Sequence, residues 1–264
     1  MKLPVALTIA GSDSGGGAGI QADLKTFAAL GVHGTSAITA ITAQNTTGVT
    51  DILELPVDLV RKQIAAVVDD IGVQAAKTGM LSSAAIIGAV AEAVRDYGLT
   101  PLVVDPVMIA KGGAKLLRED AIDALRERLI PLAAVVTPNL PEAEVLLGRP
   151  ISSLDERKRA ARDLVAMGAG AAVVKGGHAD DATDVYFDGS QMIELRAARI
   201  DTVNTHGSGC VFSAAIAAWL ARGADPLQAA REAKSFITEA IANSLQIGRG
   251  HGPVNPMFAW RKAD

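Results

Sequence analysis

Four loops of this chain of 264 residues carry glycines or polar side chains that can handle phosphate or a metal ion. They are Gly11–Gly19, Asp105–Met108, Thr137–Glu142 and Lys175–His178, and a fifth, Asn204–Cys210, opens a very apolar helical segment. Each of the four follows a short apolar run that is typical of a buried strand. In a parallel sheet, ligands bind outside the carboxyl ends of the strands. The loops are therefore expected at one rim, and together they indicate a ligand site more strongly than any one of them alone.

The first glycine loop matches two familiar phosphate motifs only in part. Gly11 and Gly16 have the separation of a Walker A loop, but glycine stands at position 17, where that motif requires lysine. Gly17–Ala22 fits a dinucleotide fingerprint on paper. It lies too far beyond the strand, however, and no acidic residue occurs between positions 24 and 50 to hold a ribose. Taken alone, the loop is better explained as a segment whose glycines allow positive φ.

Gly207-Ser208-Gly209 precedes a helix so apolar that its N-terminus must face something buried or bound. Small residues there let successive backbone N–H groups converge on an anion, and the helix dipole adds to the attraction. The same field is expected to lower the pKa of the Cys210 thiol. An ordinary helix cap followed by a small buried cysteine explains the local sequence equally well. His178 and His206 lack metal-ligand spacing, and we interpret both as polar loop residues.

Acidic residues stand directly after predicted strands in an otherwise apolar context. Asp105 is well placed to hold Mg²⁺ beside phosphate oxygens, and Asn139 and Glu142, three apart at a helix start, can face one ligand. Ordinary capping, with asparagine as the cap and glutamate supporting the first turn, explains that pair nearly as well. Lys175 ends a buried strand before two glycines, where it can serve as a counter-charge for phosphate.

The elements that position these loops alternate between short apolar or β-branched runs and longer segments of helical period, which predicts a mainly parallel sheet covered by helices. The predicted strands are Val5–Ala10, Thr35–Thr39, Gln74–Thr78, Leu102–Asp105, Ala133–Thr137 and Ala171–Lys175. The predicted helices are Ile20–Leu30, Val57–Ile71, Ala84–Tyr97, Glu119–Leu129, Pro141–Leu147, Leu154–Met167, Gly209–Arg222 and Leu227–Ala242. Thr183–Asp188 and Met192–Leu195 predict an antiparallel hairpin appended to the sheet. Without a repeat, linker or composition break, we expect one domain over residues 1–264.

Composition argues against several classes of partner. Lysine and arginine number 25 against 29 acidic residues, for a formal net charge of -4, so the chain lacks the footprint of a nucleic-acid or anionic-membrane binder. Aromatic residues make up only 3%, too few for a base-stacking surface. The single cysteine cannot form an internal disulfide, and the longest apolar run, Val211–Ala221, is too short to span a bilayer. We expect a cytoplasmic protein.

The motifs, taken in order along the whole chain, resemble a known enzyme family. The segments that carry the resemblance are Ala6–Asp23, Thr42–Asn45, Lys77–Met80, Asp105–Met108, Asn139–Glu142, Lys175–His178 and Gly207–Cys210. They resemble the hydroxymethylpyrimidine/phosphomethylpyrimidine kinases of thiamine biosynthesis, in the ribokinase superfamily. The resemblance implies a ribokinase-like three-layer α/β/α sandwich, ATP and Mg²⁺ as cofactors, and a homodimer. It also implies two successive phosphoryl transfers that turn 4-amino-5-hydroxymethyl-2-methylpyrimidine into its diphosphate.

The resemblance further implies roles for individual residues. The pyrimidine would be bound by Gly11, Asp23, Gln44, Met80 and Val107. ATP would be bound by Asp105, Asn139, Glu142 and Lys175, with Asp105 and Glu142 as the metal ligands. The catalytic anion hole would be Gly207, Ser208, Gly209 and Cys210, with Cys210 where many sugar kinases of the superfamily carry an aspartate base. Ser208 stands where threonine is usual but keeps the hydroxyl, and Ala110–Leu116 corresponds to a flap over the reacting phosphate.

Three other functions compete with this interpretation. Pyridoxal kinases share the motifs, and Gln44 is the discriminating residue: a side-chain amide both donates to and accepts from an aminopyrimidine edge, whereas pyridoxal offers no amino group there. An NAD-dependent dehydrogenase lacks its acidic ribose partner in this sequence. Non-enzymatic ligand sensing is distinguished only by whether ADP forms.

Overall fold

The computed structural model describes residues 3–108, 116–117, 120–177 and 182–261. Its strands are β1 (Val5–Asp13), β2 (His33–Asn45), β3 (Gly48–Glu54), β4 (Ala75–Thr78), β5 (Leu102–Val104), β6 (Val135–Val136), β7 (Ala172–Val174), β8 (Asp184–Phe187) and β9 (Met192–Leu195). In this part of the chain they form one sheet in the order β3-β2-β1-β4-β5-β6-β7-β8-β9. The central strands β2-β1-β4-β5-β6-β7 pair in parallel. Strand β3 at one edge, and β8 and β9 at the other, add antiparallel pairings. The mainly parallel sheet and the appended hairpin are confirmed.

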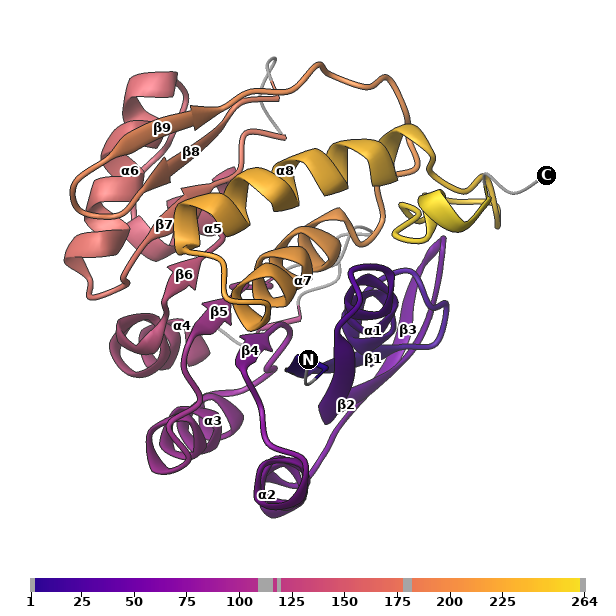
Figure 1. Ribbon diagram of the computed structural model, residues 1–264, viewed down its shortest axis with the longest axis vertical. Coiled ribbons are helices and arrows are strands. Elements are labelled where there is room, and N and C mark those ends of the chain that lie inside the picture. The colour runs from indigo at the N-terminus through magenta and orange to yellow at the C-terminus, as the bar shows by residue number, and fades with distance from the viewer. Residues whose placement is uncertain (1–2, 109–115, 118–119, 178–181, 262–264) are drawn as a thin grey trace.

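Helices cover both faces of this sheet (Figure 1). They are α1 (Gly19–Ala29), α2 (Val57–Asp70), α3 (Ala84–Asp96), α4 (Ala121–Ala124), α5 (Leu140–Leu147), α6 (Leu154–Ala166), α7 (Ser208–Ala221) and α8 (Pro226–Ala242). One face carries α1, α7 and α8, and the other carries α2 to α6. Because side chains alternate along a strand, Val103 packs on the face covered by α1, α7 and α8, and Val104 packs on the face covered by α2 to α6. The three-layer α/β/α sandwich is confirmed.

Helix α7 is apolar because other elements enclose it. All residues from Val211 to Ala218 are buried, between the strands β4 and β5 on one side and the helices α1 and α8 on the other. A helix that is buried all round needs no polar face. Its N-terminus points to the carboxyl ends of the central strands, which is where the predicted loops gather. No helix in the described ranges is long and apolar enough to cross a membrane.

Two elements near the site differ from the sequence-based prediction. Strand β1 continues to Asp13, so the first three residues of the predicted glycine loop belong to the strand, and a turn over residues 14–18 remains before Gly19 opens α1. Strand β3 was not predicted. It is an edge strand in which residues 50–53 are exposed, Asp51 among them, so it lacks the signature of a buried strand.

The predicted helix Glu119–Leu129 is broken into shorter pieces. Its first residue lies outside the described residues, α4 spans only Ala121–Ala124, and a π-helical turn (Leu125–Leu129) and a 3-10 turn (Ile130–Leu132) follow. Pro131 in the last turn has no N–H to continue an α-helical ladder, which accounts for the irregular end.

Candidate active site

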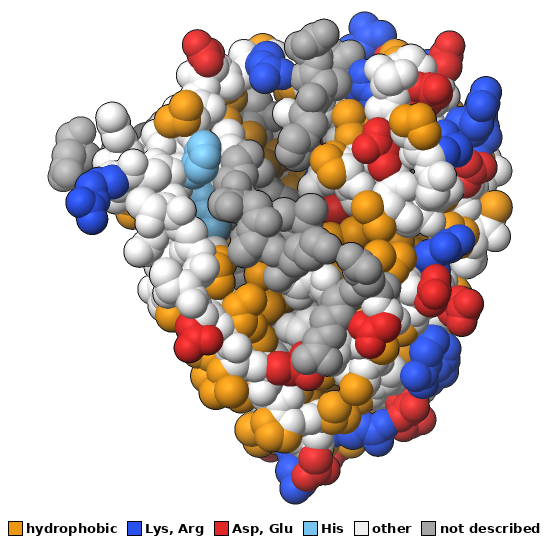
Figure 2. Space-filling model, turned by 180° about the vertical axis from the view of Figure 1, so that it is seen from behind, with side chains coloured by type: hydrophobic (Ala, Val, Ile, Leu, Met, Phe, Trp, Pro, Cys, Tyr) orange, Lys and Arg blue, Asp and Glu red, His pale blue; other side chains and the backbone are white. Residues whose placement is uncertain are grey.

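A cavity of about 410 Å³ lies where β1, β4, β5 and β7 end and α7 begins. Every predicted site residue except Asp23 lines it: Gly11, Gln44, Met80, Asp105, Val107, Asn139, Glu142, Lys175, Gly207, Ser208, Gly209 and Cys210. In the space-filling view, hydrophobic side chains lie around the middle of the face shown, and charged side chains lie mainly toward its edge (Figure 2). His178 and most of the predicted flap, Ala110–Leu116, lie outside the described residues. Only Leu116 of the flap is described, and it lines the cavity.

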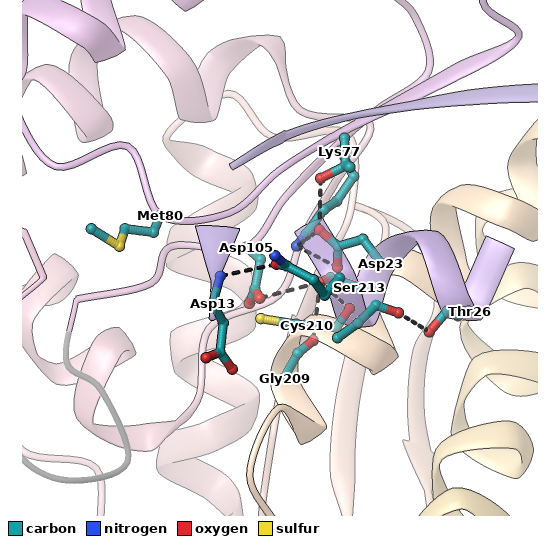
Figure 3. Close-up of polar contacts among 12 residues, drawn as sticks. Asp13, Asp23, Thr26, Lys77, Met80, Asp105, Gly209, Cys210 and Ser213 are labelled. Atoms are coloured by element: carbon teal, nitrogen blue, oxygen red, sulfur yellow. Dashed lines mark hydrogen bonds and ion pairs between the residues drawn. The ribbon is translucent and has the colours of Figure 1, made fainter. Parts of the chain in front are cut away.

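Asp23 was expected to contact the substrate, but the structure places its carboxylate behind the cavity wall. The inward face of α1 carries it to Lys77 on β4, with Nζ 2.8 and 2.9 Å from its two oxygens, and Thr8 donates to it at 2.6 Å (Figure 3). Asp23 and Lys77 are fully buried. Burial alone would lower the pKa of Lys77, but the Asp23 carboxylate raises it above its ordinary value, so the ammonium stays charged. Lys77 therefore lines the cavity, and Asp23 holds the Lys77 ammonium through its two hydrogen bonds without lining the cavity itself.

Asp105 is the centre of the polar cluster at the end of β5. Its Oδ1 accepts hydrogen bonds from Lys175 Nζ at 3.1 Å and from the Thr137 hydroxyl at 3.2 Å, and its Oδ2 accepts one from Ser213 at 3.1 Å. Burial alone would raise the pKa of Asp105, but Lys175 and Lys77 hold it below its ordinary value. The group is therefore an ionised carboxylate facing a fixed ammonium, as a site for a metal-bound phosphate requires.

Asn139 and Glu142 cap α5 and also line the cavity, so the two interpretations of this pair are compatible. Asn139 Oδ1 accepts from the Glu142 N–H at 2.9 Å, and Glu142 Oε2 accepts from the Asn139 N–H at 2.8 Å. Burial raises the pKa of Glu142 to about 7, and Lys175 acts in the opposite direction. A bound cation would favour its charged form.

The acidic groups fit a Mg²⁺ site completed by phosphate and water better than a site in which protein side chains supply all the ligands. Within the described part of the chain, no group of three or more His, Cys, Asp or Glu side chains could hold a metal ion. Mg²⁺ is commonly bound by one or two carboxylates together with phosphate oxygens and water. Asp105 and Glu142, both beside Lys175, provide that kind of incomplete donor set.

The N-terminus of α7 is open toward this cluster. Among the described residues no side chain caps it, and Gly207 adopts the left-handed conformation with φ 77°. A Cβ at Gly209 would lie 3.2 Å from Lys175 Nζ and 3.7 Å from Asp105 Oδ2, so the first turn is packed against both charges. The uncapped N–H groups, the positive end of the helix dipole and Lys175 therefore converge on one place, as expected for an anion hole.

The expected lowering of the Cys210 pKa is wrong. Burial raises the pKa of the Cys210 thiol to about 12, with Lys77 acting against the shift and the carboxylates of Asp23 and Asp105 adding to it. The thiol extends away from the α7 backbone (Figure 3). Desolvation and two nearby negative charges outweigh the field of the helix N-terminus and of one lysine, so the thiol keeps its proton at neutral pH in this state.

Three further residues line the cavity, Asp13, Lys77 and His206, and none of them was predicted as a site residue. His206 is not merely a polar loop residue, because it is buried and its Nε2 lies 2.9 Å from Asp13 Oδ2. A signal for Asp13 was present: it is an acidic residue at the end of an apolar strand, the same feature that singled out Asp105. Lys77 could be found in the same way, as the charged residue in an otherwise apolar strand.

Comparison with known proteins places this geometry in a family. The phosphomethylpyrimidine kinase family model matches residues 13–255. A hydroxymethylpyrimidine/phosphomethylpyrimidine kinase of Bacillus subtilis is 52% identical over 99% of this chain and 97% of its own length. The chain belongs to the phosphomethylpyrimidine kinase family.

Solved structures of pyridoxal kinases share the fold of this family member. The Bacillus subtilis pyridoxal kinase in an ADP complex has a TM-score of 0.92 and 42% identity, covering 99% of this chain and 100% of that one. The Staphylococcus aureus pyridoxal kinase in complex with AMP-PCP and pyridoxal has a TM-score of 0.91 and 38% identity, covering 100% and 97%. The fold is therefore common to pyridoxal kinases and to this family, so the fold alone does not decide the substrate. The residues at the end of the cavity that is predicted to bind the substrate ring must decide it.

Gly11, Gln44 and Met80, which the sequence predicts to bind the substrate ring, line the cavity. Gln44 Oε1 accepts a hydrogen bond from the Thr42 hydroxyl at 3.0 Å, which orients the amide at the cavity wall. A Cβ at Gly11 would lie 3.1 Å from Met80 Sδ, so only glycine lets the end of β1 approach this methionine without displacing it. This part of the wall thus combines the apolar side chain of Met80 with one oriented amide.

Proposed function

We propose that the protein transfers a phosphoryl group from ATP to the hydroxyl of 4-amino-5-hydroxymethyl-2-methylpyrimidine, and then a second one to the resulting monophosphate. The observation that carries the proposal is the single cavity with two chemically different ends. Gln44 and Met80 form an apolar end with one amide, and Lys175 and the N-terminus of α7 form a cationic end. Family membership supports the same reaction, because the Bacillus subtilis relative is a hydroxymethylpyrimidine/phosphomethylpyrimidine kinase.

The cationic end supplies what phosphoryl transfer needs. The reaction requires little covalent chemistry from the protein and depends on positioning and on positive charge around the transferring group. Lys175 and the N–H groups of Gly209 and Cys210 would stabilise that charge, and Asp105 and Glu142 would hold Mg²⁺. When bound, Mg²⁺ neutralises charge on the phosphate oxygens. The ATP analogue and ADP in the pyridoxal kinase structures support ATP as the donor.

The second candidate is pyridoxal phosphorylation, which the pyridoxal kinase structures favour. The oriented amide of Gln44 argues for the pyrimidine, because an amide can donate to a ring nitrogen and accept from an exocyclic amino group. A site built to hydrogen-bond a substrate group rejects an analogue without it more strongly than an apolar pocket rejects one methylene. We therefore place the pyrimidine first.

Counting ADP tests both candidates in one assay. With Mg²⁺-ATP and limiting hydroxymethylpyrimidine, we expect two ADP per pyrimidine consumed, because both transfers use the same cavity. Pyridoxal, assayed under the same conditions, should give a much lower kcat/KM. Turnover of pyridoxal alone would assign the protein to the second candidate, one ADP per pyrimidine would remove the second transfer, and no ADP with either substrate would leave ligand sensing.

Replacing Cys210 with alanine should slow the first transfer more than the second. The first acceptor is a hydroxyl that must lose a proton, whereas the second is a phosphate whose last pKa is about 6 and which is already largely ionised. Loss of a general base commonly costs about 10²–10⁴-fold. Because the pKa of the Cys210 thiol is about 12, only its small ionised fraction can accept the proton at neutral pH, so wild-type kcat/KM for the first transfer should also rise with pH. Single-turnover rates that fall equally for both transfers would leave Cys210 in the anion hole only.

We also propose that the kinase works as one domain spanning residues 1–264, in the cytoplasm and as a homodimer. One sheet joins strands from both halves of the described chain, which supports the single domain. The absence of a polybasic run from the sequence supports a small-molecule substrate rather than nucleic acid or a membrane. The homodimer follows from the family resemblance.

A further inference from the structure

The Asp13 carboxylate, to which the reaction above gives no role, is a buried junction between two segments. Oδ1 accepts a hydrogen bond from the Gly15 N–H at 2.8 Å. Oδ2 accepts from the N–H groups of Gly17 and Ala18 at 3.0 and 2.8 Å, and it lies 2.9 Å from His206 Nε2. The Asp13 side chain is 3% exposed and that of His206 is 10% exposed. Burial alone would raise the pKa of Asp13, but His206 and the amides hold it below its ordinary value, so the junction is a carboxylate.

The two segments that meet there are far apart in the sequence and touch closely. One is the turn between β1 and α1, and the other is the segment that leads into α7. A Cβ at Gly207 would lie 1.8 Å from the Gly17 carbonyl oxygen, and a Cβ at Gly17 would lie 2.5 Å from His206 Cδ2. The C-terminal segment completes the contact, since the His206 N–H donates to the Gly252 carbonyl at 3.1 Å. The turn between β1 and α1 therefore packs directly against the segment that forms the predicted anion hole.

This contact joins the two ends of the cavity. The turn continues from Gly11 at the ring-binding end, and its last residue, Gly19, makes a backbone hydrogen bond to the Cys210 thiol at the cationic end. The reacting atoms of two substrates must approach within about 3–3.5 Å with correct alignment, and a misplacement of about 1 Å can cost about 10²-fold in rate. A displacement of the turn relative to α7 would change that alignment without removing any group that contacts ATP.

We propose that Asp13 and His206 are positioning residues, which set the distance between the ring-binding turn and the anion hole through the Asp13 Oδ2 to His206 Nε2 hydrogen bond. The inference rests on the proposed kinase activity. A positioning pair acts on kcat, because the ATP-binding groups around Lys175 stay in place. The effect also depends on a nitrogen atom at the position of His206 Nε2. Variants that keep or lose a nitrogen at that distance from the backbone therefore test the proposal.

Glutamine and asparagine at position 206 differ in how far the side-chain nitrogen lies from the backbone. The amide nitrogen of glutamine can occupy the place of Nε2, whereas that of asparagine is one methylene shorter and stops near the place of Nδ1. We expect H206N to lower kcat for the first transfer at least tenfold with KM for ATP changed less than twofold, and H206Q to recover most of that loss. D13N should be at least as slow as H206N, because its amide nitrogen replaces an oxygen that accepts backbone N–H groups, and D13N/H206N should be no slower than D13N. His33, an exposed histidine on β2, provides the control H33N, with wild-type rates expected.

The outcomes separate the inference from the proposed function. A wild-type protein that forms no ADP would refute the function, and H206N at the wild-type rate would refute the positioning role. H206Q and H206N that are equally slow, with melting temperatures equally lowered, would make the pair structural only. A rise in KM for ATP with unchanged kcat would also overturn the inference, because it would place His206 in nucleotide binding.

Discussion

Replacing Lys175 with methionine is expected to lower kcat for both phosphoryl transfers by about 10²–10³-fold, the usual loss when one preorganised charge-stabilising group is removed from an active site. Lys175 Nζ lies 3.1 Å from Asp105 Oδ1 and beside the first turn of α7, where the transferring phosphate is proposed to lie. Methionine keeps most of the length and the apolar stem of the side chain and removes its ammonium group. Both transfers should suffer, because both use the same cationic end of the cavity.

The matched control for this variant is Lys158→Met. Lys158 pairs with Glu194 at 2.7 Å in a partly buried ion pair that does not line the cavity. Steady-state kinetics with each acceptor should show wild-type kcat for the control, and circular dichroism should show both variants folded. Asp105 keeps its hydrogen bonds from Thr137 and Ser213 in the Lys175 variant, which supports folding. A Lys175→Met protein that retains kcat within threefold would remove Lys175 from the proposed mechanism.

The largest expected effect on stability comes from Lys77→Met. The lysine and Asp23 are both fully buried, and removing one partner of a buried ion pair leaves an uncompensated charge in the interior. Such a change typically costs about 3–5 kcal/mol, whereas replacing both partners by apolar residues is often neutral. We therefore expect Lys77→Met to lower the free energy of unfolding by about that amount, and Lys77→Met/Asp23→Leu to recover most of it.

Urea denaturation of the single and double variants measures this difference. The matched control is Lys62→Met, which removes a lysine from the exposed i,i+4 pair with Asp58, and no measurable change in midpoint is expected because exposed pairs contribute little. A double variant as unstable as the single one would show that packing of the lysine stem, not charge compensation, stabilises this part of the structure. A single variant as stable as wild type would contradict the buried pair altogether.

The parts of this protein that follow from local sequence were predictable. Strand and helix periodicity reveals the central parallel sheet, and the capping box of Asn139 and Glu142 depends on two residues three positions apart. Asp105 and Lys175 are recognisable because each ends an apolar strand, and all such ends meet at one rim. The family resemblance added the ring-binding residues Gln44 and Met80, which no local pattern singles out.

Only the tertiary structure decided which charges face one another. Asp13 and His206 are 193 residues apart, and Lys77 and Asp23 are 54 apart, so no local pattern pairs them. The Cys210 pKa follows the same rule: the helix N-terminus beside it is local and favours the thiolate, but burial and the carboxylates of distant segments favour the thiol. Secondary structure is governed by neighbours in the chain, whereas desolvation and electrostatic interaction depend on neighbours in space, and those exist only once the fold has formed.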